Sequence, residues 1–230
     1  MLLSEMQSFL LKIILYVRSM WFCLQHLPAR QAIVIPILIG RGVNYKRFKG
    51  EIVIQDPIKR AMISLGVNRG TYSLADYNSH ILGEGKLIFR GTSLICAGFR
   101  FWVSKDGIIE IGRNTFMNAN TIISSNTVIS IGDNSSFGWN CSLLDWDGHH
   151  ILNCSDGEKS NPAKPITLEH CCWLSSHSTI TKGVSLCHHT IIPYGAVIFK
   201  NNITPYTLFG GSPNKMLKTG IVREDFLNLK

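Results

Sequence analysis

A repeat of six residues dominates the second half of this chain. Between residues 166 and 200, a branched aliphatic side chain returns at every sixth position: Leu168, Leu174, Ile180, Leu186, Ile192 and Ile198. Two residues before each of these stands a mostly small or β-branched residue: Ile166, Cys172, Ser178, Val184, Thr190 and Ala196. A period of six matches neither an α-helix nor a single strand. It is typical of a hexapeptide β-helix, in which short strands alternate with tight corners and one aliphatic residue per hexad fills the core.

The same period occurs upstream, with one interruption. A first run comprises Ile111, Met117, Ile123 and Ile129; the register then slips by two and continues through Ile131, Phe137 and Leu143. In both runs an Ile-Gly pair is followed by a polar pair that ends in Asn114 or Asn134. Glycine and asparagine tolerate the positive φ that tight corners need. We therefore expect an all-β protein with a parallel β-helix over residues 61–204.

The segments outside the repeat are expected to form a cap, a loop and a tail. Residues 1–60 should form a cap of helix and strands, with the helix ending near Pro28. Residues 151–165 are polar and contain prolines, which predicts an excursion loop, and a loop of this length in a solenoid is usually functional. Residues 205–230 form a basic tail, with a short helix expected near 222–229.

The apolar N-terminus leaves two interpretations open. Lys12 and Arg18 interrupt the apolar run 9–24, and Pro36 interrupts the run 33–39, so neither reaches the length of an uncharged spanning helix. No small-residue cleavage site follows, which disfavours a signal peptide. Residues 1–25 could lie on the inner membrane surface with Lys12 and Arg18 toward the head groups. Alternatively, the helix packs on a partner subunit.

Charge and cysteine content restrict the partners and the compartment. The net charge is +8, which suits anionic small molecules or lipid head groups. The basic residues are scattered and no nucleic-acid-binding module is present, so we expect no nucleic-acid partner. The seven cysteines show no paired framework, which predicts reduced thiols in a cytoplasmic protein.

The sequence DWDGHHI at 145–151 contains the first candidate for chemistry. Asp145, Asp147 and His149 alternate, so in an extended segment they would share one face. A histidine beside carboxylates can act as a general base near neutral pH. A polar turn with incidental histidines is the alternative.

Three motifs together resemble the left-handed β-helix acyltransferases, in particular bacterial O-acetyltransferases of sugars and polysaccharides. The DWDGHH stretch is similar to the family's D-x-D-x-H, whose histidine is the catalytic base. The segment 173–200, from WLSSHSTI to GAVIFK, resembles the family's W-I-G hexads, and FGGSPNK at 209–215 resembles its G-x-P-A-K ending. The resemblance covers about residues 85–220. The left-handed winding of the β-helix is implied by this resemblance alone, because parallel strands usually connect by right-handed crossovers. The resemblance also implies a homotrimer with active sites between subunits.

The resemblance also assigns roles to single residues. It implies acetyl transfer from acetyl-CoA to a sugar or glycan hydroxyl, with His149 as base, His150 as the weaker candidate, and Asp145 or Asp147 orienting the imidazole or binding sugar. It places Asn118 on the acceptor and Trp173 along the pantetheine arm. Main-chain groups of Ser176, one of them an oxyanion donor, and of Tyr194 would contact coenzyme A. The basic residues expected at its phosphates or adenine are Lys200, Lys215 and Lys218.

Several positions depart from the family pattern. Ser175, Cys187 and Pro193 stand where the family usually has glycine, so the corner geometry there can differ. Asn214 replaces the usual alanine, which we interpret as a minor change.

A rival metal site competes with this interpretation. His170 and His188 are three hexads apart and should stack on neighbouring coils beside His189 and several cysteines. Stacked histidine and cysteine can bind zinc, and the related γ-type carbonic anhydrases use three histidines. Because these residues fall at corner or inward positions, we expect them to pack in the core and at the corners and to bind no metal. Transfer to the nitrogen of an amino sugar and a non-catalytic role in assembly also stay open.

Overall fold

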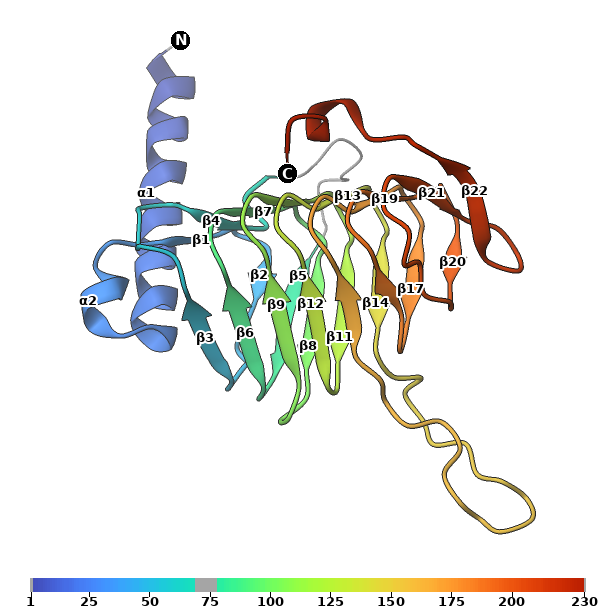
Figure 1. Cartoon of the computed structure of the whole chain (residues 1–230). Coiled ribbons are helices and arrows are strands. Elements are labelled where there is room, and N and C mark those ends of the chain that lie inside the picture. The colour runs from blue at the N-terminus through green and yellow to red at the C-terminus, as the bar shows by residue number, and fades with distance from the viewer. Residues whose placement is uncertain (1, 69–77, 230) are drawn as a thin grey trace.

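Three parallel β-sheets form a triangular prism, the parallel β-helix predicted from the hexads. The computed structural model describes residues 2–68 and 78–229; Met1, the first residue of the expected helix, lies outside this range, as do residues 69–77 and 230. Successive strands pass from sheet A to sheet B to sheet C, and each pairs with the strand one coil away (Figure 1). We call the turns between these sheets the AB, BC and CA edges.

Sheet A contains β1 (Ile37–Ile39), β4 (Ile63–Leu65), β7 (Ser93–Ile95), β10 (Thr115–Met117), β13 (Ser136–Phe137), β16 (Trp173–Leu174), β19 (Thr190–Ile192), β21 (Thr207–Gly210) and the antiparallel β22 (Lys215–Thr219). Sheet B contains β2 (Val43–Asn44), β5 (Ser79–Gly83), β8 (Arg100–Val103), β11 (Ile122–Ser125), β14 (Ser142–Leu144), β17 (Thr179–Thr181) and β20 (Val197–Ile198). Sheet C contains β3 (Glu51–Ile54), β6 (Lys86–Phe89), β9 (Ile108–Ile111), β12 (Val128–Ile131), β15 (Ile166–Leu168) and β18 (Ser185–Leu186). Because β1 to β3 already belong to these sheets, the expected boundary at residue 60 falls within the first coils.

The N-terminal helix caps the open end of the prism. Helix α1 (Leu2–His26) is followed by the short α2 (Ala29–Ala32). Phe22 and Cys23 are fully buried in the same core as the strands, while the N-terminal part of α1 extends beyond the prism (Figure 1). Arg18 turns toward the protein, where it donates a hydrogen bond to the Val43 carbonyl and lies over the Tyr45 ring. Arg18 is therefore not available at a membrane surface.

The hexad positions form the interior, as predicted. Leu168, Leu174, Ile180, Leu186, Ile192 and Ile198 are each at most 1% exposed. The inward cysteines share this environment, and burial raises the pKa of the Cys172 thiol. All seven cysteines are free of disulfides.

The register slip near residue 130 arises at the BC edge. Ile123 on β11 and Ile131 on β12 both point inward, eight residues apart, whereas Ile180 and Leu186 on the equivalent strands are six apart. The AB and CA edges keep the spacing of six in both blocks, as between Met117 and Ile123. The two additional residues thus lengthen one corner and leave the core pattern unchanged.

At the other two edges, residues in the left-handed backbone conformation recur from coil to coil. Along the CA edge, residues with φ near +55° follow one another from coil to coil: Asn114, Asn134, Cys171, His189 and Tyr206. Along the AB edge, the positive-φ residues are Gly98, Asn120, Asn140, His177 and Gly195. Asparagine occupies this region at low cost, and the Asn114 amide donates to Asn134 Oδ1 at 3.2 Å. Side chains at these corners therefore stack along the prism.

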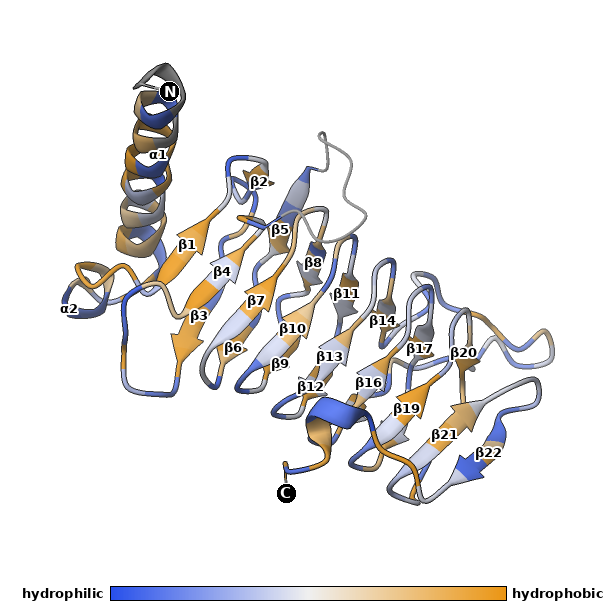
Figure 2. Cartoon of the chain, turned by 90° about the horizontal axis from the view of Figure 1, so that it is seen from above, coloured by the Kyte–Doolittle hydropathy of each residue, from blue (hydrophilic) through white to orange (hydrophobic). Residues whose placement is uncertain are grey.

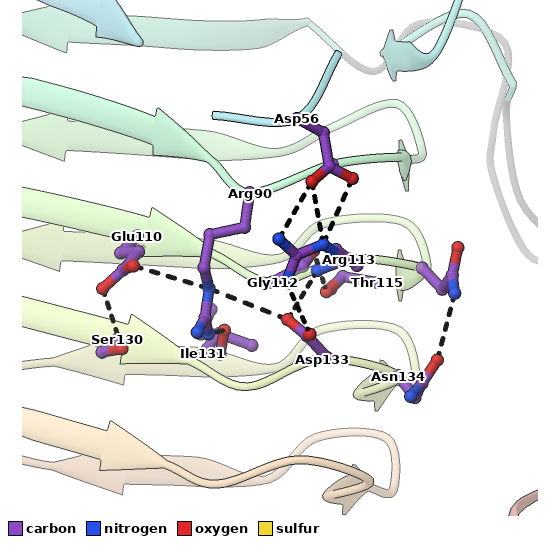
Figure 3. A network of polar contacts seen from close by, with 12 residues as sticks. Asp56, Arg90, Glu110, Gly112, Arg113, Thr115, Ser130, Ile131, Asp133 and Asn134 are labelled. Atoms are coloured by element: carbon purple, nitrogen blue, oxygen red, sulfur yellow. Dashed lines mark hydrogen bonds and ion pairs between the residues drawn. The ribbon is translucent and has the colours of Figure 1, made fainter. Parts of the chain in front are cut away.

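Charged residues join the early coils of the CA edge (Figure 3). The Arg113 guanidinium contacts Asp56 at 2.9 Å and Asp133 at 3.1 Å, and hydrogen bonds to both carboxylates raise the pKa of Arg113. Arg90 lies 3.5 Å from Glu110 and donates to the Ile131 carbonyl at 2.9 Å. These groups face one another across successive coils.

The C-terminal segment folds back over sheet A. After β22, a 3₁₀ turn, η1 (Glu224–Phe226), replaces the short helix that we expected near 222–229. Phe226 is 5% exposed, Arg223 lies 5.4 Å from the Trp173 ring centroid, and the Leu229 carbonyl reaches His189. The tail thus crosses the outer face of β16 and β19 (Figure 2).

Candidate active site

A hairpin leaves the prism at the BC edge between β14 and β15 (Figure 1). It begins at residue 145, earlier than the expected 151. Leu152 and Lys159 form an antiparallel bridge, and the Ser160 N–H donates to the Ile151 carbonyl at 2.8 Å. From β5 to β12, the corners of this edge contain two to four residues. The predicted excursion loop is therefore an ordered hairpin that projects from one edge.

Asn161 clamps the base of this hairpin. Its side chain is buried, with 6% exposed. Its amide nitrogen donates to Asp147 Oδ2 at 2.9 Å and to the His149 carbonyl at 2.8 Å, while its oxygen accepts the Ile151 N–H at 2.6 Å. The Asn161 amide thus fixes the chain before and after His149.

Asp147 links the clamp to the next coil. Its carboxylate pairs with Lys182, which lies at the following BC corner. Hydrogen bonds from Lys182 and then from Asn161 lower the pKa of Asp147 below its ordinary value. Asp147 therefore holds the hairpin base against the prism in its ionised form.

Asp145 has a structural role, contrary to the expectation that it could orient His149 or bind sugar. It is fully buried and accepts hydrogen bonds from the backbone N–H groups of Asn126 and Thr127, both at 2.8 Å. The hydroxyls of Thr127 and Ser125 donate to the same carboxylate at 2.8 and 3.1 Å. A buried carboxylate requires such donors. The segment also bends at Gly148, so the three alternating residues do not share a face.

The two histidines of the motif differ in their surroundings. Both are exposed. The His150 ring packs against Trp146 with centroids 5.7 Å apart. His149 has its main chain fixed by Asn161 and stands at the exposed base of the hairpin. The structure thus holds the ring of His150 and the main chain of His149.

Three other predicted residues lie together at the AB edge: Asn118, Ser176 and Tyr194. Asn118 is 7% exposed and its side-chain oxygen accepts the Ala119 N–H at 2.8 Å. Ser176 is 5% exposed and its hydroxyl accepts the Trp139 N–H at 3.2 Å. Tyr194 is 66% exposed and its ring lies 5.1 Å from that of His177. Sequence reasoning missed His177, which also accepts a hydrogen bond from the Trp139 indole at 3.1 Å.

The remaining predicted residues lie toward the C-terminal end. Trp173 sits on the outer face of sheet A, where Arg223 covers part of its ring. Lys200, Lys215 and Lys218 are exposed on the last coil and on β22. Exposed ammonium groups fit a polyanion such as the phosphates of coenzyme A.

Within one chain, the predicted residues divide between two edges of the prism. Asp147 and His149 belong to the BC edge, whereas Asn118, Ser176 and Tyr194 belong to the AB edge. The two groups therefore do not share one corner of the prism.

Two further residues hold this region and were not predicted as important. Asn161 lay unmarked in the polar segment, and no sequence signal distinguished it from its neighbours. Asn214, which we interpreted as a minor change, is 6% exposed and bonds the Phe199 N–H at 2.7 Å and the carbonyls of Val197 and Gly211 at 2.8 Å. It ties β22 to the last coil.

Comparison with solved structures supports the fold. No protein-family model and no curated protein sequence matches the chain. The structure is similar to that of the polysialic-acid-specific acetyltransferase NeuO, with a TM-score of 0.62, 20% identity, and 81% of this chain and 85% of that chain covered. It is also similar to that of a mutant of AntD, an N-acyltransferase from Bacillus cereus in complex with dTDP and coenzyme A, with a TM-score of 0.50, 12% identity, and 84% of each chain covered. At these identities the likeness concerns the fold, and the predicted left-handed β-helix with an N-terminal helix is confirmed.

Proposed function

We propose that this protein is an acetyl-CoA-dependent acetyltransferase that modifies a hydroxyl of a sugar or glycan. The observation that carries the proposal is the clamped hairpin base, where Asn161 fixes the main chain of the exposed His149. The resemblance of the DWDGHH, hexad and FGGSPNK motifs to the sugar O-acetyltransferases supports it. The fold shared with a polysialic-acid-specific acetyltransferase supports it as well.

The proposed reaction needs one proton-transfer group. His149 takes the proton of the acceptor hydroxyl as the oxygen attacks the thioester carbonyl. When the tetrahedral intermediate collapses, the C–S bond breaks, the acetyl ester forms, and the imidazolium returns the proton to the coenzyme A thiolate. An imidazole is suited to both steps because its ordinary pKa lies near neutrality.

We further propose that the active site lies between subunits of a homotrimer. The BC edge carries His149, and the AB edge carries Ser176 and Tyr194, so one subunit would supply the base and its neighbour the surface for the pantetheine arm. In this arrangement Asn118 would contact the acceptor, and the exposed lysines Lys200, Lys215 and Lys218 would meet the anionic end of coenzyme A.

The test is transfer of labelled acetyl groups from acetyl-CoA to a panel of polysaccharide, nucleotide-sugar and amino-sugar acceptors. We expect His149→Ala to reduce transfer about 10²- to 10⁴-fold, with coenzyme A binding and the unfolding midpoint unchanged. His150→Ala, which changes the neighbouring exposed ring, is the matched control. Near-normal transfer by His149→Ala would refute the assignment of the base.

A mixing experiment tests the shared site. Subunits carrying His149→Ala and subunits carrying Ser176→Trp, which blocks the AB edge, are each expected to be inactive alone. Co-expressed, they should recover part of the activity, since some interfaces then combine two unmodified edges. A monomer in analytical ultracentrifugation, or no recovery in mixed oligomers, would exclude the intersubunit site.

We also propose that α1 attaches the protein to the cytoplasmic face of the inner membrane. Among the described residues, one helix, Glu5–His26, has the length and composition of a membrane span, despite Lys12 and Arg18. Core helices and signal sequences can also meet these criteria. Phe9 and Val17 are 63% and 65% exposed, and only 18% of the most apolar window is buried, so the described residues leave most of this apolar surface uncovered.

The attachment can be tested by flotation with anionic vesicles. Deleting residues 1–25 would also remove the buried Phe22 and Cys23, so Leu10→Glu with Ile14→Glu is the sharper change. We expect this double variant to lose vesicle binding while it keeps the circular dichroism of the folded chain. Absence of the unmodified protein from the vesicle fraction would contradict the proposal.

A further inference from the structure

Three histidines converge at the C-terminal end of the CA edge. His170 lies between β15 and β16, and His188 and His189 lie between β18 and β19 on the next coil. The rings of His170 and His188 are parallel, with centroids 4.8 Å apart, and one nitrogen from each of the three histidines lies within 4.8 Å of the others. We expected these residues to fill the corner; the side-chain positions bring three metal-binding donors together.

The hydrogen bonds of His189 define its tautomer. Its Nε2 lies 3.1 Å from the Leu229 carbonyl, and because a carbonyl only accepts, Nε2 carries the proton. In the neutral ring Nδ1 then holds a lone pair. Metal-binding histidines commonly donate their other N–H to a carbonyl or carboxylate, which fixes the ring. His189 already has this arrangement.

The lone pair of His189 faces a second imidazole. Its Nδ1 lies 2.9 Å from Nδ1 of His188, so in the metal-free form His188 donates a proton between them. The His189 ring is 2% exposed and stacks on Tyr206 with centroids 4.5 Å apart. The main-chain N–H of His188 donates to Glu169 Oε2 at 2.9 Å. Neighbouring groups thus restrain both histidines.

A thiol and a carboxylate lie beside the imidazoles. Glu169, Cys187 and His188 also lie close enough to share an ion. However, this group contains a single imidazole and its carboxylate is exposed, whereas the group of three histidines includes His189, which is 2% exposed. The three imidazoles are therefore the favoured ligand set.

We propose that His170, His188 and His189 bind one Zn²⁺ ion, with a water molecule or Glu169 as the fourth ligand. Imidazole is a preferred ligand of Zn²⁺, and four-coordinate tetrahedral sites are its usual geometry. Zn–N bonds of about 2.0–2.1 Å separate two ligating nitrogens by about 3.3 Å, so the pair now 2.9 Å apart would open slightly as the shared proton leaves.

Such an ion would secure the C-terminal tail. His189 is hydrogen-bonded to Leu229, and the same tail places Arg223 over Trp173. Zinc would hold the His189 ring in its present tautomer and so maintain the bond to the tail. The site is thus structural, and it does not depend on the proposed acetyl transfer.

The test uses the tag-free full chain in a Cys154→Ser background, because Cys154 is an exposed thiol that could bind metal by itself. Titration with Co²⁺ as a spectroscopic substitute should give visible d–d bands of tetrahedral intensity at one ion per chain, without the strong charge-transfer band of a thiolate ligand. Calorimetry with Zn²⁺ should give the same stoichiometry. His170→Ala and His188→Ala should each weaken Zn²⁺ binding at least tenfold, whereas His80→Ala on β5 should leave it unchanged.

Protection of the C-terminal tail from trypsin provides a second test, which does not rely on measuring the affinity for Zn²⁺. Trypsin cleavage after Arg223 should slow when Zn²⁺ is added to the Cys154→Ser protein, and this protection should be lost in the His188→Ala variant. Lack of stoichiometric binding by the folded protein would overturn the proposal. So would equal binding by the His170→Ala and His80→Ala variants.

Discussion

Between residues 111 and 198, the BC edge of the prism varies in length, whereas the AB and CA edges do not. From residue 111 to residue 198, inward residues on either side of every AB and CA corner are six positions apart. Across the BC edge the spacing changes from eight, between Ile123 and Ile131, to the long hairpin between Leu143 and Leu168, and then to six, between Ile180 and Leu186. In these coils the core therefore accommodates insertions at the BC edge.

This difference separates two uses of a corner. At the constant edges, corner side chains contact their equivalents on the next coil, as Asn114 contacts Asn134 and His170 stacks on His188. At the variable edge, the insertion carries polar groups away from the prism and exposes His149. Repetition thus supplies the scaffold, and the departure from it supplies the candidate chemistry.

The largest loss of stability should follow removal of the buried carboxylate at the BC edge. Asp145→Ala would leave the N–H groups of Asn126 and Thr127 without their acceptor, at a cost of about 3 kcal/mol in the free energy of unfolding. Asp156→Ala, in the exposed part of the hairpin, is the control and should change stability by less than about 0.5 kcal/mol. Urea denaturation compares the two, and equal stabilities would show that Asp145 does not support the corner.

The clamp should have a smaller effect on stability and a measurable effect on activity. Asn161→Ala removes three hydrogen bonds around His149, which should cost about 1–2 kcal/mol. It should also reduce acetyl transfer about 10-fold, because the base loses its fixed position. Asn153→Ala, elsewhere in the hairpin, is the matched control. If both variants transfer acetyl groups normally, the hairpin base does not position His149.

The fold was predictable because the hexad signal is local and repeated. Each coil needs the same inward residue, so Leu168 and its five successors identify the sheets, and even the slip at Ile131 marks a real change in one corner. The N-terminal coils were harder to delimit, because β1 to β3 lie outside the clear hexads. The left hand came from resemblance, since the spacing of core residues is the same for either hand.

The candidate site was only partly predictable, because its contacts join residues far apart in sequence. The alternation of Asp145, Asp147 and His149 suggested a shared face, but Asp145 turns inward to bind donors on the preceding coil. Asn161 and Lys182 approach Asp147 only once the hairpin closes and the next coil forms. The residue types in this segment indicated polar chemistry, whereas the hydrogen-bond and ion-pair partners of each residue depended on the tertiary structure.

Acidification should release the hairpin base before it affects the prism. Because the pKa of Asp147 is lowered in the folded protein, its contribution is fully present above the ordinary value of 3.8 and is lost as pH falls through the lower folded value. Proteolysis of the hairpin by pepsin should therefore accelerate below about pH 4. Asp147→Asn should show rapid cleavage already at higher pH, with a flatter pH dependence. An identical pH profile for both proteins would exclude Asp147 as the titrating group.

The smallest effect should come from the exposed charges of the CA edge. Arg113 contacts Asp56 and Asp133, but its side chain is 47% exposed, so water and salt screen both ion pairs. Arg113→Gln should lower the unfolding midpoint less than Asn161→Ala does, and the difference from the unmodified protein should disappear in about 1 M salt. The effect of Asp145→Ala should persist at the same salt concentration, because that carboxylate is buried. A loss for Arg113→Gln as large as that for Asp145→Ala would mean that ion pairs, and not the core and backbone ladders, hold the constant edge together.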